Sequence, residues 1–225
     1  VMLLHGYAAD AKSQDSYFGV SNLAREKGFL VALPDGTESS VKNRFWNATD
    51  ACCNLEGQKV DDVAYLTAVI ADMKRRFNVD PKRVFIAGHS NGGFMTHTFA
   101  CEHADQVAAV ASLAGALDTD PDCTPSVPVS VLQVHGTADD TISYEGGEIA
   151  GRSYTSAAKT VALWRAVDHC SGDAHSGDRL DADAEVAGED LRQTTWTGCR
   201  AGTEVSLWTI TGGSHVPTLT PAFTV

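Results

Sequence analysis

Apolar runs of strand length alternate with segments of helical periodicity along this chain, and this alternation limits the fold more than any other feature. Strands are expected over residues 1–4, 29–33, 83–87, 107–113, 129–134 and 204–210. Successive strands joined by helices pair in parallel, because each helix carries the chain back across the sheet. The sequence therefore predicts an α/β fold, with a mainly parallel central sheet and helices on both of its faces.

The clearest helix is expected over residues 60–77, where apolar residues recur at helical spacing. These residues are Val63, Leu66, Ile70, Met73 and Phe77. Further helices are expected over 16–27 with Gly28 as the stop, over 91–102 and over 154–168. With 225 residues, 43% of them hydrophobic, residues 1–225 are expected to form a single domain that is clipped at both ends.

The formal net charge of −12 argues against a nucleic-acid partner, because phosphates require a concentrated basic surface. No apolar run approaches the length of a membrane span, so no membrane partner is expected. The oligomeric state stays open.

The cysteine content predicts disulfides. The six cysteines are Cys52, Cys53, Cys101, Cys123, Cys170 and Cys199. They form an even set without a CxxC pair or a metal-ligand spacing, which favours disulfides in a secreted, extracellular protein whose signal peptide is not visible in the chain. The alternative is a cytosolic protein in which several of them are free buried thiols.

Two segments interrupt the alternation. Residues 37–59 form a long polar connection that contains Trp46 and the cysteine pair, and long loops in compact domains are often functional. Residues 171–192 are acidic and poor in apolar groups, which predicts a solvated surface insertion. The DADAE stretch within them lacks the glycine that a calcium loop requires.

The stretch AGHSNGGFM, residues 87–95, contains a candidate nucleophile. GHSNG fits the GxSxG pattern, in which Gly88 and Gly92 allow a sharp turn that exposes Ser90 between a strand and a helix. The alternative is an ordinary tight turn, in which glycine adopts backbone angles that other residues avoid.

A serine nucleophile needs an imidazole base and a carboxylate that orients the imidazole. Asp139 or Asp140 follows the strand expected at 129–134, and Asp139 is favoured by the HGxxDxxI spacing, although either could be a turn residue. His215 follows the last expected strand, in TGGSHVP. Serine, acid and histidine therefore come in the chain order of the α/β-hydrolase arrangement.

Backbone donors for an oxyanion are expected at two places. The N–H of Asn91 follows the serine, and the N–H of Tyr7 follows the His-Gly pair in LLHGY, which could alternatively be an ordinary strand end. The histidines form no HxH or HExxH pattern, so we expect no catalytic metal, and the chemistry requires no cofactor.

With these motifs in place, the chain resembles the polyhydroxybutyrate depolymerase-like esterases, a family of secreted α/β-hydrolases that also takes in feruloyl esterases. The likeness lies in LLHGY, FWNATDACC, VDDVAYL, VFIAGHSNGGFMTHTFAC, VHGTADDTISY and GCRAGTEVSLWTITGGSH. It implies an α/β-hydrolase fold, Ser90 as nucleophile, Asp139 as acid, His215 as base, and a disulfide between Cys170 and Cys199. Trp46, in the FWNA motif, either binds substrate in the acyl or alcohol pocket or merely anchors its loop.

The resemblance predicts a serine esterase that hydrolyses carboxylic esters, first of all short-chain polyhydroxyalkanoate polyester or its oligomers. The alternatives are a feruloyl or acetyl esterase of plant cell-wall polysaccharide and a catalytically inactive binding module. One departure weakens the inference of substrate, because Val216 and Pro217 follow His215 where many relatives have a Thr-Trp-Pro turn.

Overall fold

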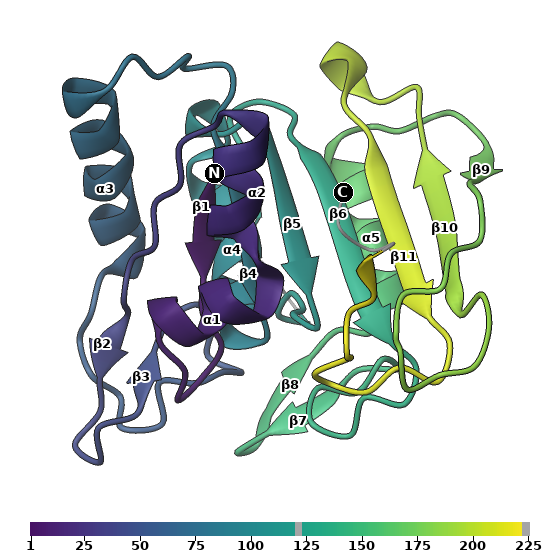
Figure 1. The fold of residues 1–225 in the computed structure, drawn as a ribbon, viewed down its shortest axis with the longest axis horizontal. Helices are drawn as coiled ribbons and strands as arrows, with labels where there is room; N and C mark the ends of the chain where they lie inside the picture. The colour runs from purple at the N-terminus through teal and green to yellow at the C-terminus, as the bar shows by residue number, and fades with distance from the viewer. Residues whose placement is uncertain (120–122, 222–225) are drawn as a thin grey trace.

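Within residues 1–119 and 123–221, which the computed structural model describes, seven strands form one sheet (Figure 1). In spatial order they are β1 (Met2–Leu4), β4 (Phe85–His89), β5 (Ala109–Leu113), β6 (Ser130–Gly136), β11 (Val205–Ile210), β10 (Leu191–Trp196) and β9 (Ala174–Ser176). The first five pair in parallel and the last two are antiparallel. The mainly parallel sheet predicted from the sequence is confirmed.

Helices cover both faces of this sheet (Figure 1). They are α1 (Ala11–Phe18), α2 (Val20–Lys27), α3 (Asp62–Arg76), α4 (Asn91–Glu102) and α5 (Ala157–Val167). The buried residues of α3, α4 and α5, such as Leu66, Phe99 and Trp164, form one core with the sheet. On the opposite face, which carries α1 and α2, Leu113 and Ile210 belong to a second apolar cluster.

The remaining elements are short. They are the hairpins β2 (Thr37–Glu38) with β3 (Arg44–Phe45) and β7 (Gly147–Ile149) with β8 (Arg152–Tyr154), and the 3-10 turns η1 (Ala104–Gln106) and η2 (Arg200–Gly202). Both hairpins lie at the end of the sheet where the parallel strands terminate (Figure 1). No helix in the described part of the chain is long and apolar enough to cross a membrane.

Two predicted elements differ from the structure. The strand expected at 29–33 is reduced to one bridge, in which Ala32 pairs with Met2. Pro34 directly follows this run, and proline has no N–H with which to extend the pairing. The helix expected at 16–27 is two helices, because Gly19 between them adopts a left-handed conformation with φ 66°.

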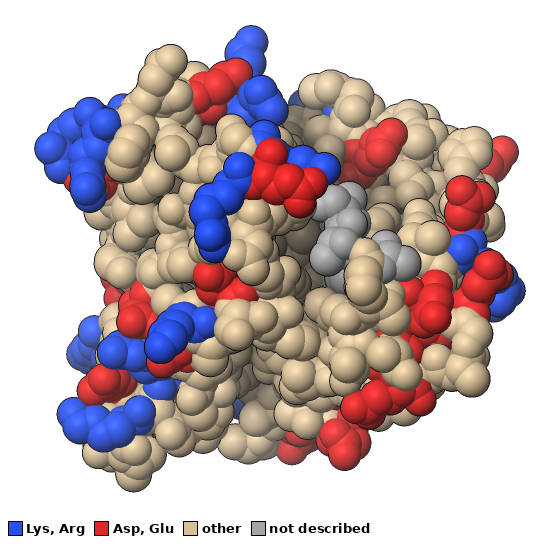
Figure 2. All heavy atoms as spheres, in the orientation of Figure 1, with Lys and Arg blue, Asp and Glu red and all other residues tan. Residues whose placement is uncertain are grey.

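The acidic segment 171–192 is more than the solvated insertion that its composition predicts. It contains β9 and the start of β10, and its Asp190 carboxylate is buried. That carboxylate accepts backbone hydrogen bonds from Ala182 and Asp183 at 2.6 and 3.1 Å. Burial of this charge is tolerated because it satisfies backbone donors. Other acidic side chains gather at the surface near β9 and β10 (Figure 2).

Three disulfides are present, and they join Cys170 to Cys199, Cys101 to Cys123, and Cys52 to its neighbour Cys53. The pairing of Cys170 with Cys199, which the family resemblance implies, is confirmed. This bond ties the chain just after α5 to the connection between β10 and β11.

Asp168, at the C-terminal end of α5, has no exposed surface. Its Oδ1 accepts a long hydrogen bond from the Val129 N–H at 3.4 Å, and Oδ2 has no partner among the described residues. Burial in this position raises the pKa of Asp168 from 3.8 to about 6.

We expect Asp168→Asn to stabilise the protein increasingly as the pH rises from 3.8 to about 6. In this range Asp168 is largely ionised in the unfolded chain but still largely protonated in the folded protein. The wild type therefore loses stability as the pH rises, and the neutral amide avoids this loss. The Tm difference between variant and wild type should grow by about 2–4 °C for each kcal/mol of difference in the free energy of unfolding. It should level off above this pH range. Thermal unfolding across this range tests the prediction, with exposed Asp173→Asn as the control. A difference independent of pH would contradict it.

Candidate active site

Ser90 lies on a sharp turn between β4 and α4, at the carboxyl end of the central strands. Its backbone angles are φ 54° and ψ −120°, a strained conformation for a residue other than glycine. The turn is held by the Ser90 N–H, which donates to Leu113 O at 2.8 Å, and by the Ser90 carbonyl, which accepts from Phe94 N at 3.0 Å. The packed scaffold therefore fixes the serine in an otherwise unfavourable geometry.

The two glycines of the GxSxG motif are required by close backbone contacts. A Cβ on Gly92 would lie 2.4 Å from the carbonyl oxygen of Leu4, and a Cβ on Gly88 would lie 2.2 Å from that of Gly92. These separations are far below van der Waals contact, so α4 can begin against β1 and β4 only where side chains are absent.

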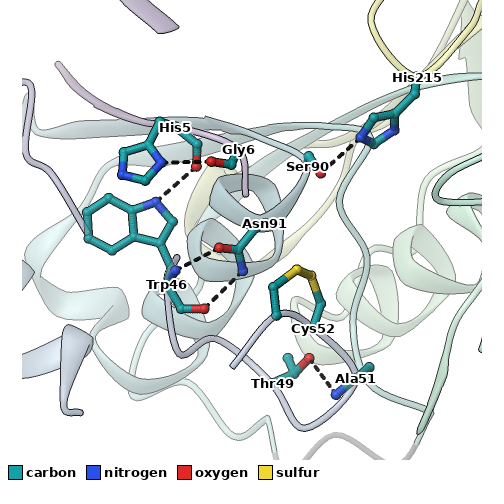
Figure 3. The surroundings of a disulfide bond; sticks show 10 residues. His5, Gly6, Trp46, Thr49, Ala51, Cys52, Ser90, Asn91 and His215 are labelled. Carbon is teal, nitrogen blue, oxygen red and sulfur yellow. Dashed lines mark hydrogen bonds between the residues drawn. A yellow bond between two sulfur atoms is a disulfide. The ribbon is translucent and has the colours of Figure 1, made fainter. Parts of the chain in front are cut away.

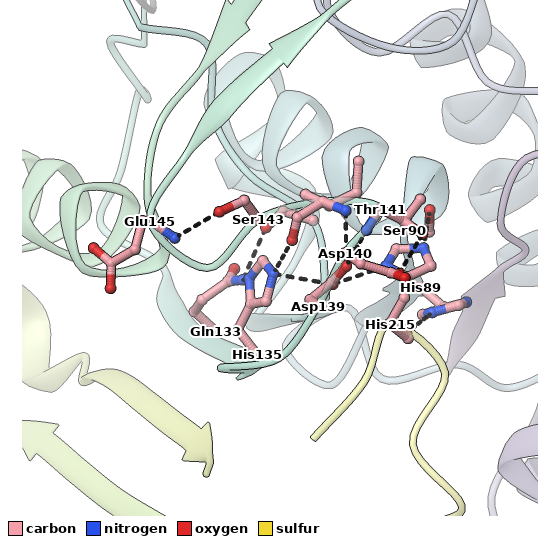
Figure 4. A network of polar contacts seen from close by, with 12 residues as sticks. His89, Ser90, Gln133, His135, Asp139, Asp140, Thr141, Ser143, Glu145 and His215 are labelled. Carbon is pink, nitrogen blue, oxygen red and sulfur yellow. Dashed lines mark hydrogen bonds and ion pairs between the residues drawn. The ribbon is translucent and has the colours of Figure 1, made fainter. Parts of the chain in front are cut away.

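The structure brings Ser90, His215 and Asp139 into one hydrogen-bonded chain (Figure 4). His215 Nε2 lies 2.9 Å from Ser90 Oγ, and His215 Nδ1 lies 2.8 Å from Asp139 Oδ2. The side chain of Asp140 is directed elsewhere, and its carboxylate lies near the Thr141 hydroxyl. Of the two aspartates considered from the sequence, only Asp139 contacts His215.

The loop that carries Asp139 and the loop that carries His215 approach each other at a glycine, which has no side chain. A Cβ on Gly136 would lie 2.2 Å from the carbonyl oxygen of Gly213, so only glycine permits this approach. The buried Asp139 carboxylate also accepts the N–H groups of Thr141 and Ile142 at 2.9 and 2.7 Å. Its orientation is thus fixed by its own loop as well as by His215.

Burial alone would raise the pKa of Asp139. Hydrogen bonds from His135 and His215 outweigh this effect and hold the pKa of the carboxyl well below its usual value. Asp139 is therefore ionised at neutral pH and is able to stabilise a protonated His215.

His89 fixes the backbone of His215. Burial lowers the pKa of His89 to about 4, so the ring is neutral near pH 7 and can donate from one nitrogen only. Its Nε2 lies 2.9 Å from the carbonyl oxygen of His215, which cannot donate, so Nε2 carries the proton. The sequence places His89 beside Ser90 in the GHSNG motif but does not show this contact.

The structure shows how the two backbone amides that are predicted to bind an oxyanion are held. Asn91 is the first residue of α4, so its N–H has no acceptor within the helix. His5 Nε2 accepts the N–H of Gly36 at 2.9 Å, which leaves the proton on Nδ1 to bind Gly6 O at 2.8 Å. A planar peptide directs its C=O and N–H in opposite directions, so His5 also fixes the direction of the Tyr7 N–H.

Trp46 has 0% exposed surface, which does not fit the pocket-lining role considered from the sequence. Its Nε1 donates to His5 O at 2.9 Å, and its backbone N–H and C=O pair with the side chain of Asn91 at 2.7 and 2.9 Å (Figure 3). This placement favours the anchoring alternative. Sequence reasoning missed the Asn91 side chain, because its partner lies 45 residues away.

The disulfide of Cys52 and Cys53 is close to this anchor (Figure 3). Cys52 packs in a buried apolar cluster with Phe94, Ile142 and Tyr154, and Cys53 is only partly buried.

Among the described residues no group of three or more His, Cys, Asp or Glu side chains could hold a metal ion.

Two solved structures with a similar fold are described as esterases. An acetyl xylan esterase from Aspergillus awamori matches with a TM-score of 0.65 and 15% identity, over 96% of this chain and 83% of that one. Esterase PE8 matches with a TM-score of 0.59 and 15% identity, over 95% and 83% of the two chains. The chain therefore has the α/β-hydrolase fold.

Sequence comparisons point to the same class. The model of the prolyl oligopeptidase family matches residues 16–126, which include Ser90 but neither Asp139 nor His215. Feruloyl esterase B of Piromyces equi is 28% identical over 220 residues, and a bifunctional acetylxylan esterase/xylanase of Neocallimastix patriciarum is 27% identical over 226 residues. These alignments cover 94% and 96% of this chain but only 38% and 28% of the two relatives.

The chain is thus similar to esterases and has the α/β-hydrolase fold, while it spans well under half the length of the two relatives compared above. Within that class, the resemblance to the esterases that include feruloyl esterases is confirmed. The relatives fit the feruloyl or acetyl esterase alternative better than the polyhydroxybutyrate depolymerase that we expected first.

We expect Gly92→Ala to destabilise the protein and to lower esterase activity, because the added methyl group would force α4 away from β1 and displace Ser90. Overpacking of this kind costs about 1–3 kcal/mol or more. Thermal unfolding and the rate of ester hydrolysis measure the two effects. Glu102→Ala, at the exposed end of the same helix, is the control and should stay within about 0.5 kcal/mol of wild type. Unchanged Tm and rate in Gly92→Ala would contradict the close contact.

Proposed function

We propose that this protein hydrolyses feruloyl esters of plant cell-wall polysaccharide, with acetyl esters of the same polymers as the second candidate substrate. The hydrogen-bonded chain of Ser90, His215 and Asp139 carries the proposal of activity. The choice of substrate is supported by the relatives, which are described as feruloyl esterases and acetylxylan esterases.

In the proposed mechanism, Ser90 Oγ attacks the ester carbonyl while His215 Nε2 removes its proton. Asp139 holds the proton of His215 on Nδ1 and stabilises the imidazolium that forms. His215 then donates its proton to the departing alcohol, which leaves an acyl group on Ser90. Water, activated by the same imidazole, releases the carboxylic acid and restores the serine.

The tetrahedral intermediate places negative charge on the former carbonyl oxygen. We assign its stabilisation to the N–H groups of Tyr7 and Asn91, and the loss of one such donor typically costs about 2.7–4 kcal/mol. The His5 contact with Gly6 and the start of α4 at Asn91 support this assignment, because both amides are fixed before substrate binds.

We also propose that the protein works outside the cell. Its six cysteines form three disulfides, and disulfides of this kind persist in oxidising compartments. A cell-wall polysaccharide would be reached there.

Replacement of the nucleophile is expected to abolish turnover. Ser90→Ala should lower kcat for methyl ferulate by roughly 10⁴- to 10⁶-fold, because the covalent route is lost. A serine-directed fluorophosphonate should label the wild type and the exposed-surface control Ser153→Ala, but not Ser90→Ala. Turnover that survives in Ser90→Ala would overturn the mechanism.

The substrate assignment predicts a preference among esters. We expect kcat/KM for methyl ferulate to exceed that for a hydroxybutyrate oligomer by at least roughly 10-fold, because differential contacts of a bound group give discrimination of this size. Acetate release from acetylated xylan is measured in parallel and would support the second candidate if it were faster. Faster hydrolysis of the oligomer would restore the depolymerase reading, and cleavage of a feruloyl amide would indicate a peptidase.

A further inference from the structure

A chain of buried polar side chains extends from Asp139 into the core, on the side away from His215. It consists of His135 and Gln133 on β6, His97 on α4 and Trp164 on α5. All four side chains have 0% exposure, so none of them contacts solvent or substrate. Gln133, His97 and Trp164 take no part in the proposed reaction steps.

The indole N–H of Trp164 determines which ring nitrogen of His97 carries the proton. An indole N–H can only donate, so Trp164 Nε1 donates to His97 Nδ1 at 3.0 Å. Burial lowers the pKa of His97 to about 4, so the ring is neutral near pH 7. Its single proton is therefore on Nε2, which donates to Gln133 Oε1 at 2.8 Å.

The side-chain amide of Gln133, oriented in this way, determines which ring nitrogen of His135 carries the proton. With Oε1 bound to His97, Gln133 Nε2 faces Gly115 O at 2.8 Å and His135 Nδ1 at 3.2 Å. An amide nitrogen only donates, so His135 Nδ1 is the acceptor. The proton of His135 is consequently on Nε2.

His135 presents this proton to the loop of the acid. Nε2 lies 2.7 Å from Ile142 O and 3.2 Å from Asp139 Oδ2 (Figure 4). Oδ2 is also the oxygen that His215 Nδ1 contacts at 2.8 Å. Asp139 Oδ2 therefore lies between two imidazole nitrogens. One belongs to His215 on the catalytic loop, and the other belongs to His135 in the core, whose N–H is shared between Asp139 Oδ2 and the nearer Ile142 O.

We propose that His135 is a positioning residue, whose Nε2–H, oriented by Gln133, His97 and Trp164, holds the Asp139 carboxylate in line with His215. This inference rests on the proposed function, because it requires that Asp139 serve His215 in catalysis. The low pKa of Asp139, to which the His135 hydrogen bond contributes, is consistent with it. The same N–H binds Ile142 O, so His135 anchors the loop of Asp139 as well as its carboxylate.

A matched pair of substitutions separates the donor from the volume of the ring. His135→Gln keeps an N–H close to the Nε2 position, whereas His135→Met has a similar length and no donor. We expect His135→Met to lower kcat roughly 10- to 100-fold with little change in KM, as for loss of a hydrogen bond to a charged group. His135→Gln should recover most of the rate. Equal loss in both variants, or no loss in His135→Met, would overturn the proposal.

A double-mutant cycle tests whether His135 acts through Asp139. In the Asp139→Asn background, His135→Met should lower kcat by less than about 3-fold, because the carboxylate on which His135 acts is gone. The full single-mutant loss in that background would indicate an independent structural role. Tyr144→Phe is the packing control, since its ring meets His135 edge-on and its hydroxyl is bound by Thr209 instead.

The unmutated protein offers a second measurement that does not depend on how the variants fold. The ¹⁵N shifts of His135 at mildly alkaline pH should report the Nε2–H tautomer, and the Nδ1–H tautomer would overturn the proposal.

The activities of Ser90→Ala and Asp139→Asn are measured beside that of His135→Met, to separate failure of the positioning role from failure of the proposed function. If both retain wild-type rates, the proposed function fails. If both lose activity while His135→Met does not, only the positioning role fails.

Discussion

The close approach of α4 to the ends of β1 and β4 is the contact on which the rest of the site depends. Because Gly88 and Gly92 carry no side chains, the helix begins directly beneath the strand ends. Ser90 is thereby held in a strained conformation, and the amide of Asn91 is placed beside it. The strain is balanced by packing, since the backbone of Ser90 is bonded to both β5 and α4.

Neutral buried histidines hold the loops around this turn. His5 fixes the Gly6 peptide, His89 the carbonyl of His215, and His135 the acid loop. A neutral imidazole can donate at one nitrogen and accept at the other, so it can connect two backbone segments without introducing a buried charge. This explains why several histidines surround the site although, in the described part of the chain, only the His215 side chain is hydrogen-bonded to Ser90.

The sequence predicts the parts of the site that depend on local order along the chain. A glycine-flanked serine between a strand and a helix, and an aspartate and a histidine after later strands, can be found by pattern alone. The His97 and Gln133 contacts could not, because their partners come from different elements and depend on packing. Composition also misjudged Asp190, since counting charges does not show that a carboxylate accepts nearby backbone N–H groups.

The two hairpins at the carboxyl end of the sheet are held differently from the proposed catalytic side chains. Asp139 and His215 are held by groups from the core, whereas the hairpins β2–β3 and β7–β8 stand at the carboxyl end of the sheet (Figure 1). Asp50, in the loop after β3, forms an exposed ion pair with Arg152, in β8. This ion pair contributes little stability. Under the proposed function, changes in these hairpins would alter which ester is bound without moving Ser90, His215 or Asp139.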